Sequence, residues 1–177
     1  MSDFTLYPFP TDRSLPQVKI GGRVERVNGI LSIEYQLQGD LDSVVILPPS
    51  DSPTRTFALW EHTCFEFFIG SPGEANYWEF NLSPSGDWNV FILDDYRQGL
   101  RAESAFTELP LQIDRQLDTL SLSGSWDLTK IISAERQLEI AISTVVKSER
   151  DEISYWALAH KGTEPNFHLR DSFIIKI

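Results

Sequence analysis

An imidazole, a thiol and a carboxylate stand at every second position near the middle of the chain, at His62, Cys64 and Glu66. In an extended strand, residues two apart point to the same side, so these three would share a face with the preceding Trp60. The residues between them are mostly large and apolar, which predicts that the other face packs into a core.

The next strand-like run, residues 77–83, repeats this arrangement, with Tyr77, Glu79 and Asn81 on one face. Two neighbouring strands would then present aromatic, carboxylate, amide and imidazole groups together. Aromatic rings can cover the apolar C–H faces of a sugar, while the polar groups bond its hydroxyls. The simpler interpretation, a polar sheet face with a few half-buried aromatic residues, stays open.

A second group of candidate residues lies near the C-terminus. A strand-like run carries Trp156 and ends at His160, and the following loop of turn-forming residues carries Phe167, His168 and Arg170. Binding residues concentrate on loops held by a rigid scaffold, so we expect this loop to contribute to a site. The alternative is that Phe167 merely anchors the loop while His168 is exposed.

Metal and nucleophile chemistry gain less support. Residues four apart in a strand are separated by about 13 Å, too far for one ion to contact His62, Cys64 and Glu66 together, so we predict no metal site there. Calcium near the acidic pair 94–95 stays open, although no EF-hand-like pattern is present. No Gly-x-Ser-x-Gly motif occurs, and Cys64 in mid-strand is expected to be an inert buried thiol. Glu66 and Glu79 could in principle serve as the acid and base of a glycosidase.

The composition excludes several classes of partner. Fifteen Lys and Arg stand against twenty-six Asp and Glu, giving a net charge of −11, which disfavours nucleic acid and anionic membrane surfaces. The single cysteine excludes an intramolecular disulfide framework and fits a reducing compartment. Neither a spanning apolar run nor a signal-peptide pattern is visible, so we expect a cytoplasmic protein.

The segments that must position these residues are predicted to be strands, because apolar residues recur at every second position. Residues 30–37 alternate and follow residues 18–27 through Asn28-Gly29, a strong hairpin signal. The one candidate helix is residues 126–132, capped by Asp127. We therefore predict a single domain over residues 1–177, an all-β antiparallel sandwich of the jelly-roll or immunoglobulin-like kind with at most one short helix. The other expected strands are 43–47, 56–60, 63–69, 77–83, 88–93, 108–113, 117–125, 137–146, 153–160 and 173–177.

Three blocks in the same order resemble the DOMON-like proteins related to family 9 carbohydrate-binding modules. They are residues 59–66, 78–88, and 155–160 with 166–168, and the likeness extends from about Trp60 to Phe173. The resemblance implies a β-sandwich whose relatives bind sugars or heme. In the sugar binders an aromatic residue and a glutamate six positions later hold the saccharide, and a second aromatic residue closes over it.

Trp60 and Glu66 match that first pair, and the resemblance offers Phe167 or Trp156 as the second aromatic residue. The chain departs from the pattern at His62 and Cys64, where the sugar-binding modules usually carry aspartates. Heme-binding relatives often use Met and His, but the only methionine here is Met1, so a heme site would need two histidines from among His62, His160 and His168.

Our leading hypothesis is a non-catalytic binding domain for a saccharide or similar small polar ligand. The alternatives are a heme-binding or redox accessory domain with His/His ligation, and a glycoside hydrolase using the two glutamates. The candidate ligand-binding residues are Trp60, His62, Glu66, Tyr77, Glu79, Asn81, Trp156, His160, Phe167, His168 and Arg170.

Overall fold

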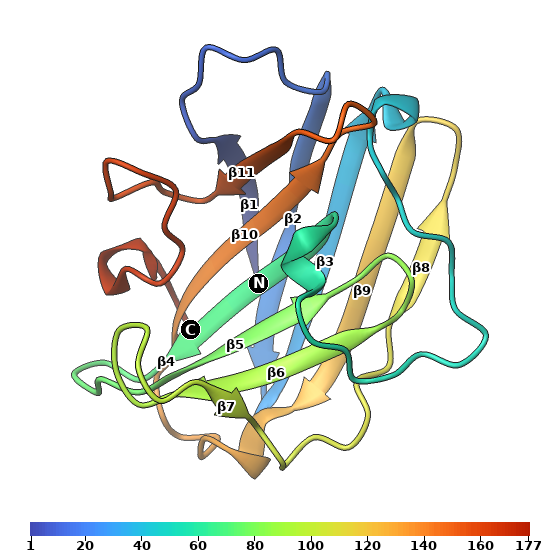
Figure 1. Cartoon of the computed structure of the whole chain (residues 1–177). Coiled ribbons are helices and arrows are strands. Elements are labelled where there is room, and N and C mark those ends of the chain that lie inside the picture. Colours follow the sequence, from blue (N-terminus) through green and yellow to red (C-terminus); the bar gives the residue numbers. More distant parts are fainter.

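The computed structural model describes residues 1–177 and shows an antiparallel sheet that curls into two facing layers (Figure 1). Its strands are β1 Ser2–Pro8, β2 Val18–Val27, β3 Ile30–Gly39, β4 Cys64–Gly70, β5 Tyr77–Leu82, β6 Trp88–Leu93, β7 Arg101–Ala102, β8 Gln112–Arg115, β9 Thr119–Asp127, β10 Glu139–Lys147, β11 Ile153–Ala157 and β12 Ile175–Lys176.

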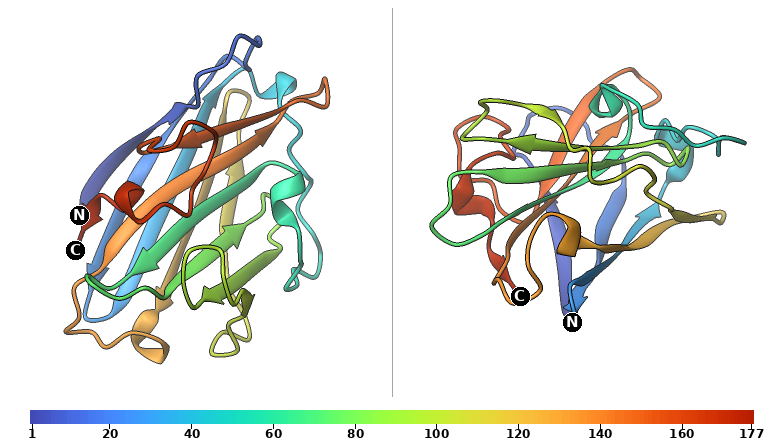
Figure 2. Two further views of the ribbon diagram at one scale, coloured as in Figure 1. Left: turned by 60° about the vertical axis from the view of Figure 1, so that its left-hand side comes forward. Right: turned by 90° about the horizontal axis from the view of Figure 1, so that it is seen from below.

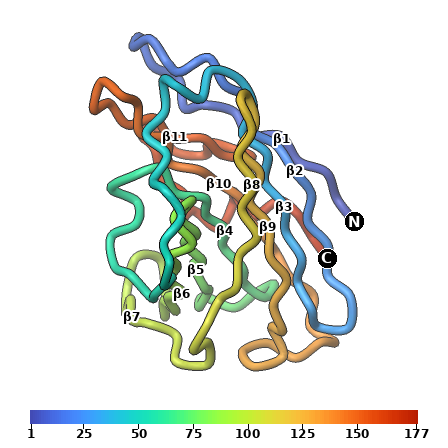
Figure 3. Tube along the Cα trace, turned by 90° about the vertical axis from the view of Figure 1, so that its right-hand side faces the viewer, coloured from blue at the N-terminus to red at the C-terminus, as the bar shows by residue number.

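One layer has the strand order β7-β6-β5-β4-β10-β11, and the other has the order β1-β2-β3-β9-β8. Strand β1 pairs with both β11 and β2 and so joins the layers along one edge, while β12 pairs with β10. Seen from the side, the two layers face each other across the interior (Figure 3). The predicted all-β antiparallel sandwich is confirmed.

The hairpin between β2 and β3 forms as its sequence predicts. Asn28 has φ 50° and Gly29 has φ 83°, the left-handed conformation that a type I′ turn requires at both central residues. Val27 therefore pairs with Ile30, and this register turns the alternate apolar residues of β3 into the interior.

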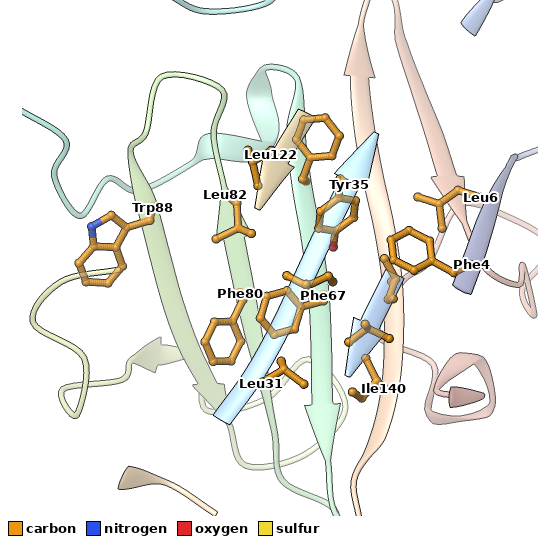
Figure 4. Close-up of a cluster of buried hydrophobic side chains, with 14 of the residues drawn as sticks. Phe4, Leu6, Leu31, Tyr35, Phe67, Phe80, Leu82, Trp88, Leu122 and Ile140 are labelled. Carbon is orange, nitrogen blue, oxygen red and sulfur yellow. The ribbon is translucent and has the colours of Figure 1, made fainter. Parts of the chain in front are cut away.

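The core lies between the layers and is rich in stacked aromatic rings (Figure 4). Phe67 of β4 stacks on Phe80 of β5 with ring centroids 4.3 Å apart, and on Trp126 of β9 at 5.8 Å. The two layers thus interdigitate through side chains from strands far apart in the sequence, which fixes β4 and β5 firmly in place.

Several expected elements differ in the structure. Residues 43–47 form a single bridge at Val44 rather than a strand, and the 3₁₀ turn η1 (Leu41–Ser43) ends at the first of them. Residues 56–60 also leave the extended conformation, because Ala58 has φ 59° and leads into the 3₁₀ turn η2 (Leu59–Glu61). The predicted strand 108–113 is wrong over most of its length: β8 overlaps it only at residues 112 and 113, after Pro110, which has no N–H to donate to a ladder. Strands β1 and β7 were not predicted.

The candidate helix shrinks to one 3₁₀ turn, η3 (Leu128–Lys130). Asp127 caps it as predicted, because its Oδ1 accepts from the backbone N–H of Thr129 at 2.9 Å. A further 3₁₀ turn, η4 (Arg170–Ser172), lies near the C-terminus. No helix of the structure reaches the length and apolar character needed to cross a bilayer.

Candidate ligand-binding cleft

The outer face of strands β4, β5 and β10 carries polar side chains in a buried setting. The register places Glu66 between Ser143 of β10 and Asn81 of β5, while Glu79 lies opposite Phe68. Glu66 is only 3% exposed, Glu79 5% and Asn81 fully buried. The same strands direct their intervening residues into the core, so this polar row follows from the alternation of a strand.

The C-terminal segment, residues 158–173, covers part of this outer face (Figure 2). Phe173 packs against Phe68 and Tyr77, with ring centroids 6.0 Å and 5.8 Å apart. Phe167 packs edge-on against Tyr155 of β11 at 6.0 Å. These contacts turn an outer sheet face into a partly enclosed site.

Arg170 fastens the segment to the sheet. Its guanidinium donates to the backbone oxygen of Ser71 and to Glu139, each at 3.0 Å, and lies 4.6 Å above the Phe173 ring. It passes directly over Gly70, where a Cβ atom would lie only 1.7 Å from Arg170 Nη1. A larger residue at the end of β4 would therefore displace this guanidinium from its position.

A cleft of about 480 Å³ opens between the segment and the sheet. Aromatic side chains of Trp60, Tyr155 and Phe167 form part of its lining, and the deeply buried Glu66 and Glu79 form its floor. The remaining lining residues are Leu93, Arg97, Leu100, Val145, Glu164, Pro165 and His168.

A second cleft of about 470 Å³ lies on the outer face of the opposite layer and is bordered by Ser32, Glu34 and Ser125. It contains no aromatic side chain in its lining. Because ligand sites combine apolar and aromatic walls with a few convergent polar groups, the cleft over Glu66 and Glu79 is the stronger candidate.

A short hydrogen-bonded chain at the cleft joins Arg97, Tyr77 and His168 and ends before Glu79 on the floor. Tyr77 Oη accepts from the backbone N–H of Arg97 at 3.2 Å and lies 2.8 Å from His168 Nδ1. We assign the tyrosine hydroxyl as the donor to Nδ1, because this direction gives its proton a partner, and the imidazole proton is then on Nε2. That nitrogen lies 3.9 Å from Glu79 Oε2, too far for a hydrogen bond.

The two carboxyl groups of the floor differ in their partners. Glu79 Oε1 accepts from Asn81 Nδ2 at 2.8 Å, but Glu79 Oε2 is buried and has no hydrogen-bond partner. Glu66 Oε2 accepts from the Ser143 hydroxyl across 3.4 Å, a weak bond. Neither glutamate has an ion pair with a lysine or an arginine.

Burial controls the protonation of the site. It raises the pKa of Glu79 to about 7, although the Asn81 hydrogen bond and the charge of Arg97 act in the opposite direction. Burial and, second, the charge of Glu79 raise the pKa of Glu66 well above its usual range. For His168, burial and then the charge of Arg97 lower the pKa to about 4, so this imidazole is neutral at neutral pH.

The structure brings together most of the predicted site residues. Trp60, Glu66, Glu79, Phe167 and His168 line the cleft. Tyr77 and Asn81 lie directly behind them and hold His168 and Glu79 through hydrogen bonds. Arg170 lies outside the cleft and positions the segment that carries Phe167 and His168.

Three predicted residues lie elsewhere. His62 does not line the cleft, because the turn at η2 ends the extended alternation before β4 begins. Trp156 lies in the core between the layers, 5% exposed, and its indole N–H donates to Ser154 Oγ. His160 bonds the backbone oxygen of Tyr7 at 2.8 Å and packs on Phe9.

The sequence interpretation missed Arg97, Tyr155 and Glu164 as lining residues. Tyr155 neighbours Trp156 in a strand, and the alternation alone does not say which of the two faces outwards. Arg97 occurs in a surface turn with φ 53°, and nothing in its local sequence indicates that the turn folds over β5.

Comparisons with known proteins identify the fold. A scan against models of known families finds no match, and a search of curated proteins finds no significant match. Among solved structures, a protein from Bacteroides uniformis described as a candidate carbohydrate-binding protein superimposes with a TM-score of 0.65 at 11% identity, over 96% of this chain and 84% of that one.

A family 9 carbohydrate-binding module from Caldicellulosiruptor kristjanssonii was solved in complex with glucose, and it superimposes with a TM-score of 0.51 at 8% identity. The match covers 85% of this chain and 71% of the module, and the cellotriose complex matches with the same score over 70% of the module. The chain therefore has the β-sandwich fold of carbohydrate-binding modules of this family.

Proposed function

We propose that the chain is a non-catalytic carbohydrate-binding domain and that its ligand occupies the cleft over Glu66 and Glu79. The observation that carries the proposal is the joint lining of one cleft by aromatic side chains and by buried hydrogen-bonding groups. Fold neighbours solved with glucose and cellotriose support the same ligand class.

The chemistry of a sugar ring fits this lining. A pyranose offers apolar C–H faces, which Trp60 and Phe167 can cover, and a rim of hydroxyls that both donate and accept. Glu79 Oε2 needs a donor, and the Nε2–H of His168 can donate in turn. The volume of about 480 Å³ falls within the range of small-molecule sites.

The heme alternative loses its support because the histidines have separate surroundings. His168 bonds Tyr77 in the cleft, His160 bonds the backbone of Tyr7, and His62 lies at the end of η2. The structure shows no pair of imidazoles directed at a common site, which bis-histidine ligation would require.

Calorimetric titration with glucose, cellobiose and cellotriose tests the proposal, with substitution of Trp60 as the decisive variant. We expect Trp60→Ala to weaken binding about tenfold or more, because it removes one apolar wall. Tyr7→Ala is the matched control, since Tyr7 is an exposed aromatic residue outside the cleft. Unchanged affinity of Trp60→Ala for every sugar that binds the wild type would disprove the stacking role.

The non-catalytic assignment has its own check. We expect no turnover of aryl glycosides by the wild-type protein. Measurable hydrolysis that is abolished by Glu66→Gln would instead support the glycosidase alternative.

A further inference from the structure

The floor of the cleft has carboxylates without a cationic partner. Glu66 and Glu79 lie on adjacent strands and occupy diagonal positions of the same face, since Glu66 lies opposite Asn81 and Glu79 lies opposite Phe68. Elsewhere in the molecule, carboxylates such as Glu34 and Glu139 pair with arginines. The two buried glutamates, which have the greatest need of a counter-charge, have none.

The lack of a partner is clearest for Glu79. Its side chain is 5% exposed and lines the cleft, one oxygen is bonded by Asn81, and the other has no donor. A native structure rarely leaves a buried carboxylate oxygen unpaired, so the partner of Oε2 is expected to be something that enters the cleft.

The other groups facing Glu79 do not supply that partner. Glu66 and the buried Cys64 come from β4, and Tyr77 on its own strand gives its proton to His168. His168 is neutral and remains 3.9 Å away. Arg97 lowers the pKa of Glu79 through its charge but makes no ion pair with it.

The composition of the lining points the same way. Three carboxyl groups, those of Glu66, Glu79 and Glu164, stand against the single guanidinium of Arg97. Burial raises the pKa of Glu66 and Glu79, and a cation beside them would favour their ionised forms and lower both pKa values again. A hydroxyl group can donate one hydrogen bond to this floor, whereas an ammonium group offers three donors and a compensating charge. Trp60, an aromatic residue of the same lining, adds a favourable environment for a cation.

We propose that the cleft selects an amino sugar, whose protonated amine donates to Glu79 Oε2 and to Glu66, over the corresponding neutral sugar. This inference rests on the proposed carbohydrate-binding function and names the ligand class more narrowly.

The test compares three sugars that share one ring and differ at a single substituent: glucosamine, glucose and N-acetylglucosamine. Titrated near neutral pH, glucosamine is expected to bind about tenfold more tightly than glucose, a difference that one charge-assisted contact can produce. N-acetylglucosamine lacks the charge and is expected to lose that advantage. Glu79→Gln is expected to reduce the ratio of the glucosamine and glucose affinities to about one.

Glu34→Gln is the matched control, because it removes the same charge from β3 in the opposite layer. We expect it to keep the wild-type ratio. A second measurement uses the wild-type protein and so does not require a variant to fold. Acidification well below the pKa of Glu79, about 7, completes the protonation of the floor while the sugar amine stays charged, so the preference for glucosamine should disappear at low pH.

The outcomes separate the two proposals. If glucose binds as tightly as glucosamine, the amine preference is overturned while carbohydrate binding stands. If none of the three sugars nor any oligosaccharide binds, both proposals fail. A preference for glucosamine that Glu79→Gln leaves intact would show that the cation is held elsewhere and would also overturn the inference.

Discussion

The two faces of strands β4 and β5 are equally buried but have opposite chemistry. On the inner face, Phe67 and Phe80 stack in the core between the layers. On the outer face, Glu66, Glu79 and Asn81 lie beneath the C-terminal segment, and one buried oxygen of Glu79 has no hydrogen-bond partner. Each strand contributes to both faces through alternate residues.

This difference separates the face that stabilises the fold from the face that we propose as the ligand-binding site. Burial of apolar rings contributes favourable free energy, whereas burial of carboxyl groups without full pairing costs free energy. Every residue of β4 and β5 is buried, so exposure alone would not distinguish the two faces. The two faces are distinguished by the hydrogen-bond partners of their side chains.

The largest expected effect breaks the inner face. Phe67→Ala removes a ring stacked on both Phe80 and Trp126, and we expect it to lower the free energy of unfolding by about 3–5 kcal/mol. Phe68→Ala on the outer face is the matched variant. We expect it to lower the free energy of unfolding by less, because Phe68 belongs to a small cluster of 6 buried residues that includes Phe173 of the C-terminal segment. Urea titration measures both, and equal losses would show that the two faces form one core.

The inner face was predictable from the sequence and the outer site only in part. Alternation in a strand assigns Phe67 and Phe80 to one side without knowledge of the rest of the chain. The same alternation placed Glu66 and Glu79 together, but it could not show that Ala58 would end the extended run before His62. Long-range packing, not local pattern, decides which loops close over the face.

The next expected effect concerns stability as a function of pH, to which Glu79 and His168 of the outer face contribute with opposite signs. The pKa of Glu79 rises from 4.5 to about 7 on folding, so the folded state binds more protons and stability decreases as the pH rises through this window. The pKa of His168 falls from 6.5 to about 4, so stability decreases as the pH falls through that window. Each change of pKa corresponds to about 3 kcal/mol of stability.

Glu79→Gln and His168→Gln should therefore tilt the stability profile in opposite directions between the acidic and neutral ends. Without Glu79, acidification becomes more destabilising relative to the wild type. Without His168, a rise of pH becomes more destabilising relative to the wild type. Glu66 contributes to the pH dependence of stability in the same direction as Glu79, because its pKa is also raised. Thermal or urea unfolding across this range checks the signs, and parallel profiles would contradict the assignment of these groups.

A smaller loss of stability is expected for substitution of Arg170, which attaches the C-terminal segment to the sheet. Arg170→Ala removes bonds to Ser71 and Glu139, and we expect a loss of about 1–2 kcal/mol together with faster amide exchange in residues 158–173. Arg26→Ala is the control, because Arg26 likewise makes two hydrogen bonds, to the backbone oxygens of Ser133 and Arg136, away from the cleft. Faster exchange of the C-terminal segment in both variants would refute a specific role for Arg170.

The smallest expected effect compares one tyrosine hydroxyl from each face. Tyr35 donates across the core to the backbone oxygen of Glu66 at 2.7 Å, and Tyr77 donates to His168 on the outer side. Replacement of either by phenylalanine removes one hydrogen bond and should cost about 0.5–1.5 kcal/mol of stability.

Only Tyr77→Phe leaves His168 Nδ1 without its donor, which allows the imidazole proton to move between its two nitrogens. Ring ¹⁵N chemical shifts of His168 should then report mixed tautomers, and sugar affinity should fall, whereas Tyr35→Phe should change neither. If Tyr35→Phe weakens binding as much as Tyr77→Phe does, the two faces are coupled through the backbone of β4, and the separation between a stabilising face and a binding face does not hold.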